Sequence, residues 1–415
     1  RGLVRGDGAR VRDANGEWYV DWICALGAIS LGYHHAAVDA AVRSQVDDGP
    51  IFSLPDEVLE ETTAEVLCEL VPCAEAVRFL KTGSEATEAA VRVARAYTGR
   101  EAVLTCGYHG WHSWYAATRE YAPGVPLAYC KLAKSFRYND LASLDEALEW
   151  ADSRAEHGEL YNRDAAAVIL EPTLFEKPAP GFLEGVRERC DRVGALLIFD
   201  EMVTGFRWHE GGYQSVCGVV PDLATFGKGM GNGYPIAALV GREGPMRWAR
   251  LASGTFNGDC VGLAAARATM QRYAQGGGCE HMREIGQALM DEYNRLAAGL
   301  AAPTRAEGQP YHPRIVWDEE GAGVISQAGS YDPPTGAANR HRASLFFQEC
   351  ARRGVLFHPD GVNISMAHDW EALGKTMAAV KTAMTMTVDA IDHGNALAKI
   401  EGDPISPEPP WRVTR

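Results

Sequence analysis

The sequence predicts an α/β fold, with a large domain on a mostly parallel sheet and a smaller α+β domain formed from both ends of the chain. Between residues 84 and 250, helical segments alternate with short, continuous apolar runs. Such runs are typical of strands buried on both faces of a parallel sheet, and their alternation with helices indicates α/β architecture. The 415 residues, 46% of them hydrophobic, suffice for two lobes.

The first element is a β-hairpin in residues 9–22, "ARVRDANGEWYVDW". We expect it to turn at Asn15-Gly16 in a type I′ turn, which needs positive φ at both positions. A helix follows over 84–99, "SEATEAAVRVARAYTG", with Ala86, Ala90, Val93 and Tyr97 on one face.

The strands of the large sheet are expected where the apolar runs lie: 102–105, 166–170, 195–199, 223–226 and 236–240. A second amphipathic helix is expected from about Asp369 to Met386, and the proline-rich tail 402–415 should lie extended over the surface. We assign 1–50 to the small domain, 51–290 to the large domain and 291–415 to the small domain again.

Charge and cysteine content limit the classes of function that the sequence supports. Forty Lys and Arg against 55 Asp and Glu give a net charge of −15, which argues against nucleic acid or an anionic membrane as partner and favours a small-molecule substrate. No run of eighteen apolar residues predicts a membrane span. The ten cysteines are scattered, with no pair or Cys/His set at zinc spacing, so we expect no metal site and a cytoplasmic protein with reduced cysteines.

Lys228 lies among glycines in "DLATFGKGMGNGYP" (222–235). A phosphate-binding P-loop needs Ser or Thr after the lysine, but Gly229 follows, and the dinucleotide fingerprint also fails because Tyr234 replaces its third glycine. The remaining use of a lysine in a tight site is nucleophilic, as a Schiff base with a carbonyl.

Three partners suit that chemistry. Asp200 ends the apolar strand of "IFDEMVTGF", where a protonated pyridine nitrogen, as in pyridoxal phosphate, would balance its charge. Gly83 and Ser84 open a helix, and its free N–H groups make an anion site. The aromatic cluster "GYHGWHSWY" (107–115) offers a ring that could stack on a flat cofactor.

Each feature alone has a plainer interpretation. An Asp-Glu after a strand is typical of a helix N-cap, Gly-Ser before a helix is an ordinary cap, and aromatic clusters commonly belong to a core or an interface. Their occurrence in one order at successive strand ends favours a cofactor site, because ligands bind at those ends in α/β sheets.

Taken together, these motifs resemble the class III aminotransferases, which are pyridoxal-phosphate enzymes of fold type I. The resemblance is strongest to the glutamate-1-semialdehyde aminomutase branch, through "RGDGARVRDANGEWYVDW", "ARAYTGR", "FLEGVRERCDRVGALLIFDEMVTGFR" and "GVVPDLATFGKGMGNGYPIAALVGR". It spans nearly the whole chain and weakens after about residue 290.

The resemblance implies a role for each motif. Lys228 would form the Schiff base and shuttle the proton, and Asp200 would pair with the pyridine nitrogen. Tyr108 would stack on one face of the ring and Met202 would pack against the other. The remaining positions that it implies are Gly83 and Ser84 for the phosphate, Glu171 near the cofactor, and Thr255, which would reach the phosphate of the neighbouring subunit in a homodimer.

The positions expected to contact the substrate depart from the family pattern. The region "GVNISMAHDWEAL" (361–373) lacks the arginine and Pro-Pro pair with which many class III enzymes bind an α-carboxylate. Leu26-Gly27 replaces the aminomutase's Trp-Gly step, and "FNGDCVG" replaces Ser-Gly-Asn-Pro. Arg5 matches a position where the aminomutase has an arginine facing substrate, although a terminal arginine is commonly solvated.

We therefore predict a pyridoxal-phosphate aminotransferase that moves an amino group from a donor such as glutamate to an aldehyde or ketone, for example a keto-sugar or another natural-product intermediate. The nearest alternative is a 1,2-aminomutase of the glutamate-1-semialdehyde type, or an epimerase, using the same residues. More distant alternatives are a nucleotide-binding protein and a catalytically inactive homologue.

Overall fold

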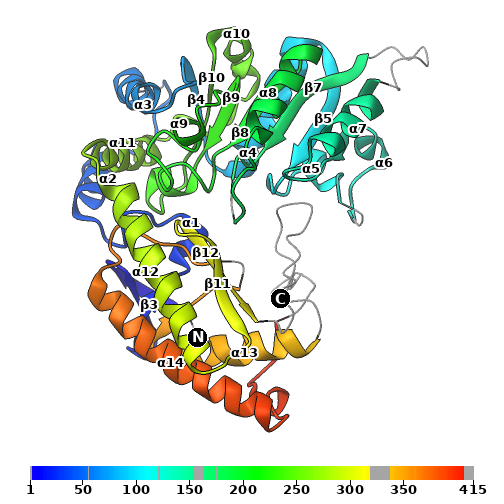
Figure 1. Ribbon diagram of the computed structural model, residues 1–415. Helices are drawn as coiled ribbons and strands as arrows, with labels where there is room; N and C mark the ends of the chain where they lie inside the picture. Colours follow the sequence, from blue (N-terminus) through cyan, green and yellow to red (C-terminus); the bar gives the residue numbers. More distant parts are fainter. Residues whose placement is uncertain are drawn as a thin grey trace.

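The computed structural model describes residues 2–54, 56–119, 122–152, 162–173, 175–317, 337–359 and 361–405. Figure 1 shows two lobes, of which the upper holds the large sheet and the lower holds the N-terminal strands and the C-terminal third of the chain. The residue boundaries of the two domains remain a prediction. Within the described residues, no helix combines the length and apolar character that crossing a membrane requires.

The large sheet has seven strands in the order β4-β10-β9-β8-β7-β5-β6. Five neighbouring strands run parallel, while β10 runs antiparallel to both β9 and β4. This confirms the predicted α/β class. The strands are β4 (Ala76–Leu80), β5 (Arg100–Cys106), β6 (Ala133–Ser135), β7 (Asn162–Leu170), β8 (Leu196–Asp200), β9 (Leu223–Phe226) and β10 (Ala237–Gly241).

The central strands are apolar throughout because both of their faces are buried. In β8, Leu196 and Ile198 belong to the apolar cluster that contains α4, whereas Leu197 and Phe199 belong to the cluster on the other face. Since successive side chains of a strand point to opposite faces, one continuous apolar run supplies two cores.

Helix α4 (Gly83–Thr98) confirms the predicted helix over 84–99. Thr82 caps it in a capping box with Glu85, and Gly99 ends it in the left-handed conformation, with φ at 68°. Ala86, Ala90 and Val93 are buried as predicted, but Tyr97 is exposed because it lies in the last turn of the helix.

Further helices pack on this sheet or lie at the junction of the lobes. The segments of the larger lobe and the junction are α1 (Cys24–Gly27), α2 (Ala36–Asp48), α3 (Glu57–Leu70), α5 (Ser113–Ala116), α6 (Leu127–Cys130), α7 (Leu141–Asp152), α8 (Phe182–Val193), α9 (Gln214–Cys217), α10 (Glu243–Met246) and α11 (Cys260–Ala274), with the 3-10 turns η2 (Lys228–Gly231) and η3 (Ala249–Leu251).

The smaller lobe joins the two ends of the chain in one sheet, as predicted. Strands β1 (Leu3–Asp7), β2 (Arg10–Asp13) and β3 (Trp18–Asp21) are antiparallel, and β13 (Val355–Leu356) adds to β3 in parallel. The lobe also contains α12 (Gly278–Gly299), the hairpin β11 (Thr304–Gln309) and β12 (His312–Trp317), α13 (Ala337–Arg352), α14 (Trp370–Asp392) and η4 (Leu397–Lys399).

Two local predictions for this lobe need correction. The turn of the N-terminal hairpin is not type I′, because only Gly16 has positive φ, at 94°. The Asp13 carboxylate accepts from Asn15 N and Glu17 N, and this side-chain capping supports a wider turn. Helix α14 also continues to Asp392, six residues beyond the predicted end. Residues 406–415 of the predicted extended tail lie outside the described part.

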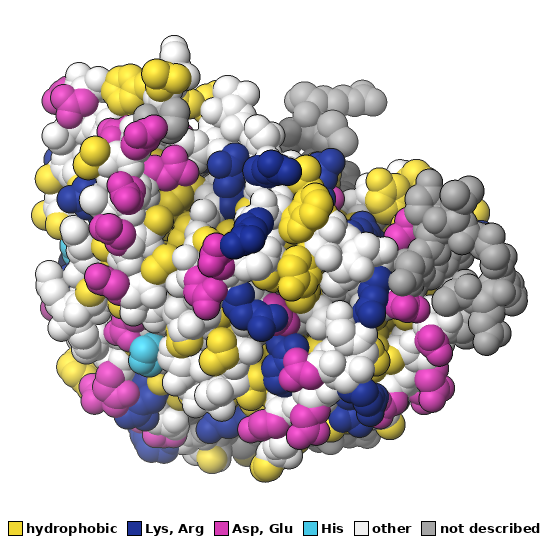
Figure 2. Space-filling view, turned by 90° about the horizontal axis from the view of Figure 1, so that it is seen from above, with side chains coloured by type: hydrophobic (Ala, Val, Ile, Leu, Met, Phe, Trp, Pro, Cys, Tyr) yellow, Lys and Arg dark blue, Asp and Glu magenta, His cyan; other side chains and the backbone are white. Residues whose placement is uncertain are grey.

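Seen from above in Figure 2, Lys and Arg side chains gather in the middle of the face, with Asp and Glu around and between them. Several arginines of the large lobe are paired with carboxylates: Arg187 with Asp191 and Asp222, and Arg247 with Glu243. The net charge of −15 therefore does not make every face acidic.

Candidate active site

Lys228 directly follows β9 and opens the short turn η2. Its φ of 41° lies in the left-handed region, as does that of Asn232 at the end of the turn. Burial lowers the pKa of Lys228, and Arg207 acts in the same direction, against the opposing influence of Asp200 and Glu171. A lysine whose pKa is lowered offers a larger share of neutral, nucleophilic amine.

Asp200 ends β8, the strand next to β9, and is 2% exposed. One carboxylate oxygen accepts from His109 Nδ1 at 2.8 Å. The other accepts from Thr225 Oγ1 at 3.1 Å and from Met202 N at 3.2 Å. Three donors on one buried carboxyl group fix its orientation.

His109 follows β5 and is 1% exposed. Its Nε2 atom is buried without a hydrogen-bond partner. Its ring stacks on Trp114, with 6.2 Å between centroids, and meets Tyr115 edge-on. With Nδ1 facing Asp200, this packing holds the imidazole in one orientation, so that its N–H donates to the carboxylate.

Glu171 fixes the loop that carries Tyr108. Its Oε2 accepts from Tyr108 N at 2.8 Å, and a side chain at Gly107 would come within 2.6 Å of that oxygen. Burial raises the pKa of Glu171 to about 7, with Asp200 adding to the effect. Tyr108 is 43% exposed; its ring meets Tyr115 edge-on, and the Arg119 guanidinium lies 5.8 Å from the ring centroid.

The start of α4 lies beside these strand ends. The N–H groups of its first residues, Gly83 and Ser84, have no acceptor within the helix, and Ser84 Oγ accepts from Trp111 N at 3.3 Å. Met202 contacts two glycines, because a Cβ at Gly83 or at Gly227 would lie 2.9 or 2.8 Å from its sulfur. The glycines thus let three backbone segments approach closely.

These groups fit pyridoxal phosphate. Lys228 supplies an amine of lowered pKa for the aldehyde. Asp200 supplies a buried carboxylate for a protonated ring nitrogen. The start of α4 supplies free N–H groups for a phosphate. Within the described part of the chain, no group of three or more His, Cys, Asp or Glu side chains could hold a metal ion.

Three other predicted residues lie apart from this cluster. Thr255 is exposed in the loop before α11. Arg5 is exposed on β1, the edge strand of the small sheet, and none of the contacts described for it involves the Lys228 cluster. Leu26, 57% exposed, belongs to a turn in which residues 24–27 all have positive φ.

That turn connects to the cluster through Arg207, which sequence reasoning did not single out. Arg207 is buried, and it donates to Ile364 O at 2.7 Å and to Gly27 O at 3.1 Å. It therefore joins the large lobe to both ends of the chain. Sequence reasoning also did not single out four other residues of the cluster: His109, Thr225, Ser30 and Asn232. Of these, His109 could have been found, because it follows Tyr108 at a strand end.

The comparisons with known proteins agree with this geometry. The model of the family described as "Aminotransferase class-III" matches residues 2–308. A protein of Cloacimonas acidaminovorans named 3-aminobutyryl-CoA aminotransferase is 38% identical over 332 residues, covering 78% of this chain and 77% of the relative. A glutamate-1-semialdehyde 2,1-aminomutase of Syntrophobacter fumaroxidans is 34% identical over 400 residues, covering 91% and 88%.

Solved structures show the same fold. An omega-transaminase from Sphaerobacter thermophilus superposes with a TM-score of 0.81 at 26% identity, over 93% of this chain and 91% of that one. The FumI protein of Sphingopyxis sp. MTA144, whose structure contains pyridoxal phosphate, also gives 0.81, at 28% identity over 94% and 89%.

Proposed function

The chain belongs to the class III aminotransferases, which use pyridoxal 5'-phosphate. We propose that it transfers an amino group from L-glutamate to an aldehyde or ketone. The observation that carries the proposal is the arrangement of Lys228 and Asp200 at the ends of neighbouring strands, with a lowered pKa for Lys228. An inactive homologue would not need to keep both groups.

Pyridoxal phosphate, when bound, supplies an aldehyde for amines and a ring that accepts the electron pair released at the substrate carbon. Lys228 would be the nucleophile toward that aldehyde and then the base whose Nζ atom takes the proton from the substrate carbon. Its partial burial and Arg207 favour the neutral amine that both tasks require.

Asp200 holds the positive charge of the ring nitrogen in place. Its three donors, His109, Thr225 and Met202 N, fix the orientation of the carboxylate. The Tyr108 ring would bound one side of the ring site, and Met202, between Gly83 and Gly227, would bound the other.

The start of α4 would hold the phosphate. Gly83 and Ser84 present N–H groups at the positive end of a 16-residue helix. Thr255 of a neighbouring subunit completes this site in a homodimer; the exposure of Thr255 is what allows that contact. Glu171 positions the Tyr108 loop and contributes a carboxyl group near Lys228.

We propose that the turn at residues 24–27 borders the substrate side of the site. Leu26 is an exposed apolar side chain of this turn, and Arg207 braces the turn through Gly27 O. The altered substrate residues favour an acceptor other than the usual 2-oxo acids, with a keto-sugar or another natural-product carbonyl as the predicted class. The 38% identical relative, named for a 3-aminobutyryl-CoA substrate, supports adding 3-oxoacyl thioesters to the acceptors tested.

A 1,2-aminomutase is the second candidate. It is favoured by the relatives named glutamate-1-semialdehyde 2,1-aminomutase, one of which aligns over 91% of this chain. The same Lys228 and Asp200 would serve it, but the amino group would return to the molecule that supplied it.

We place the enzyme in the cytoplasm, since all ten cysteines are free. The test of function is one half-reaction. L-glutamate is added to the cofactor-loaded enzyme without an acceptor, while the near-UV/visible spectrum and the 2-oxoglutarate released are followed. The proposal predicts a spectral change and one equivalent of 2-oxoglutarate per subunit.

Lys228→Ala should release none, whereas Lys375→Ala, which removes an exposed lysine paired with Glu371, should behave as the unaltered enzyme. A loaded enzyme that ignores glutamate but isomerises glutamate-1-semialdehyde would instead establish the aminomutase. Failure to bind pyridoxal phosphate would contradict both candidates.

A further inference from the structure

A cavity of about 420 Å³ lies at the junction of the lobes. It is lined by Leu31, His35, Arg272, Gly277, His281 and Met366. Its walls come from the loop before α2, the end of α11, the start of α12 and the segment before α14. Its volume is that of a small-molecule site.

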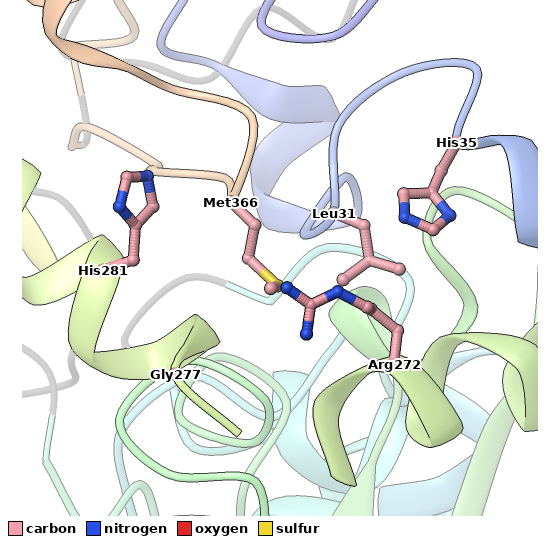
Figure 3. A pocket seen from close by; sticks show the side chains of 6 residues that line it. All are labelled: Leu31, His35, Arg272, Gly277, His281 and Met366. Carbon is pink, nitrogen blue, oxygen red and sulfur yellow. The ribbon is translucent and has the colours of Figure 1, made fainter. Parts of the chain in front are cut away.

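Arg272 is the charged group of this cavity. Figure 3 shows its side chain reaching into the middle, with His35 and His281 on opposite sides. Its hydrogen bond to Gly276 O is long, at 3.5 Å. Among the described residues, no carboxylate forms an ion pair with it, although 55 Asp and Glu are present in the chain. A half-buried guanidinium with donors to spare is suited to an oxyanion.

A histidine lies on either side of Arg272. His35 Nδ1 is buried without a hydrogen-bond partner. Burial and then Arg272 lower the pKa of His35, against Asp39, so Arg272 and His35 are close enough to interact. Asp39 itself is engaged by His34 and Arg43. His281 Nε2 donates to His368 O at 2.7 Å, which ties the far wall in place.

The start of α12 faces the same space. This helix has 22 residues, and its N-cap, Gly277, provides no side-chain hydrogen bond. The first N–H groups of the helix therefore lack a partner from the cap. Their dipole adds to the charge of Arg272, and both favour a negatively charged ligand.

We propose that this cavity is a second binding site, for a small metabolite that carries an oxyanion, either a phosphate or a carboxylate group. Arg272 holds the anion with a charged hydrogen bond, and His35 contributes a further contact. The proposal is independent of the reaction assigned to Lys228.

The site is connected to the turn that carries Lys228. Ser30 N and Leu31 N donate to Asn232 Oδ1 at 3.0 and 2.9 Å, and Ser30 Oγ donates to Gly229 O at 2.7 Å. Leu31 lines the cavity, while Gly229 belongs to η2. An anion bound in the cavity would therefore lie beside the loop that braces the catalytic turn.

The test uses the cofactor-loaded enzyme, so that the phosphate site at α4 is already filled. Inorganic phosphate and succinate are titrated separately by isothermal calorimetry at fixed ionic strength. We expect saturable binding of at least one of them, at least tenfold weaker in Arg272→Gln and a few-fold weaker in His35→Gln. Arg272→Lys, which keeps the charge, should retain measurable binding.

Arg295→Gln is the matched control, because Arg295 lies on the surface of α12 and is paired with Glu292; it should bind as the unaltered protein does. Binding of phosphate alone assigns a phosphoryl ligand, and binding of succinate alone assigns a carboxylate. Thermal unfolding without anion checks that each variant is folded. Absence of saturable binding with both anions overturns the proposal. So does a result in which the folded variants Arg272→Gln and His35→Gln bind the anion as tightly as the unaltered protein.

Discussion

His109 donates from Nδ1 to Asp200 Oδ2 across 2.8 Å, and neither side chain is more than 2% exposed. The two residues are 91 positions apart, at the ends of strands β5 and β8. Because the pair is out of contact with solvent, its hydrogen bond is stronger than it would be in water. His109 therefore helps to hold the Asp200 carboxylate in a fixed position.

Replacing His109 with Phe should slow the glutamate half-reaction about 10- to 100-fold, since hydrogen bonds to charged groups contribute about 1.5–3 kcal/mol. Stopped-flow absorbance of the loaded enzyme measures the rate. His393→Phe, at an exposed position after α14, should leave it unchanged. A full rate in His109→Phe would show that Thr225 and Met202 N are enough to hold Asp200.

Asn232 joins the catalytic turn to the N-terminal loop through three hydrogen bonds of its side chain, to Ser30 N, Leu31 N and Gly32 O. Asn232→Ala leaves buried backbone groups without partners, so the free energy of unfolding should fall by about 2–4 kcal/mol. Urea denaturation measures it. Gln287→Ala, at the surface of α12, should change the free energy of unfolding by less than about 0.5 kcal/mol. An equal loss in both variants would show that the hydrogen bonds of Asn232 do not stabilise the fold.

Glu201 should make stability depend on pH. Burial raises the pKa of Glu201 from 4.5 to about 6. The folded protein therefore holds this proton more tightly than the unfolded chain does. The contribution of Glu201 to the free energy of unfolding is fully present below pH 4.5 and is lost as the pH rises through 6. The loss should reach about 2 kcal/mol.

The free energy of unfolding, measured between pH 4.5 and 7.5, should therefore fall with pH more steeply in the unaltered protein than in Glu201→Gln. Glu171, whose pKa is raised to about 7, contributes equally to both proteins and cancels in the difference. Identical pH profiles would mean that Glu201 titrates normally.

Mixed dimers test Thr255. One subunit carries Lys228→Ala and the other Thr255→Ala. If Thr255 serves the neighbouring site, one of the two sites has both residues intact, and about half of the wild-type activity per dimer should remain at low cofactor concentration. If Thr255 serves its own site, the only site with Lys228 lacks it, and cofactor affinity should fall as in the Thr255→Ala homodimer.

Much of the fold follows from continuous apolar runs. Residues 223–226 were predicted as a strand and form β9 with the same ends, because both of its faces are buried. Strand β4 was not predicted, since Arg78 interrupts its apolar run. The antiparallel direction of β10 could not be predicted, because an apolar run is the same in either direction.

The candidate site divides in a similar way. Lys228, Asp200, Gly83 and Ser84 each follow a local signal, such as a strand end or a helix start, and the structure brings them together. Thr225 lies within the apolar run of β9, and its contact with Asp200 depends on the pairing of two strands. Such cross-strand contacts are fixed only by the assembled sheet.

The pairing of β13 with β3 bears on how the protein is made. Val355 pairs with Val20, so the ribosome must add more than 300 residues after the hairpin before its sheet can be completed. At about 5–20 residues per second, this takes roughly 20–70 s. During translation the large lobe can fold, while the apolar side chains of the hairpin, such as Val11 and Trp22, wait for their partners. The smaller lobe is therefore completed last, and its N-terminal strands are the part of the nascent chain that most needs a chaperone.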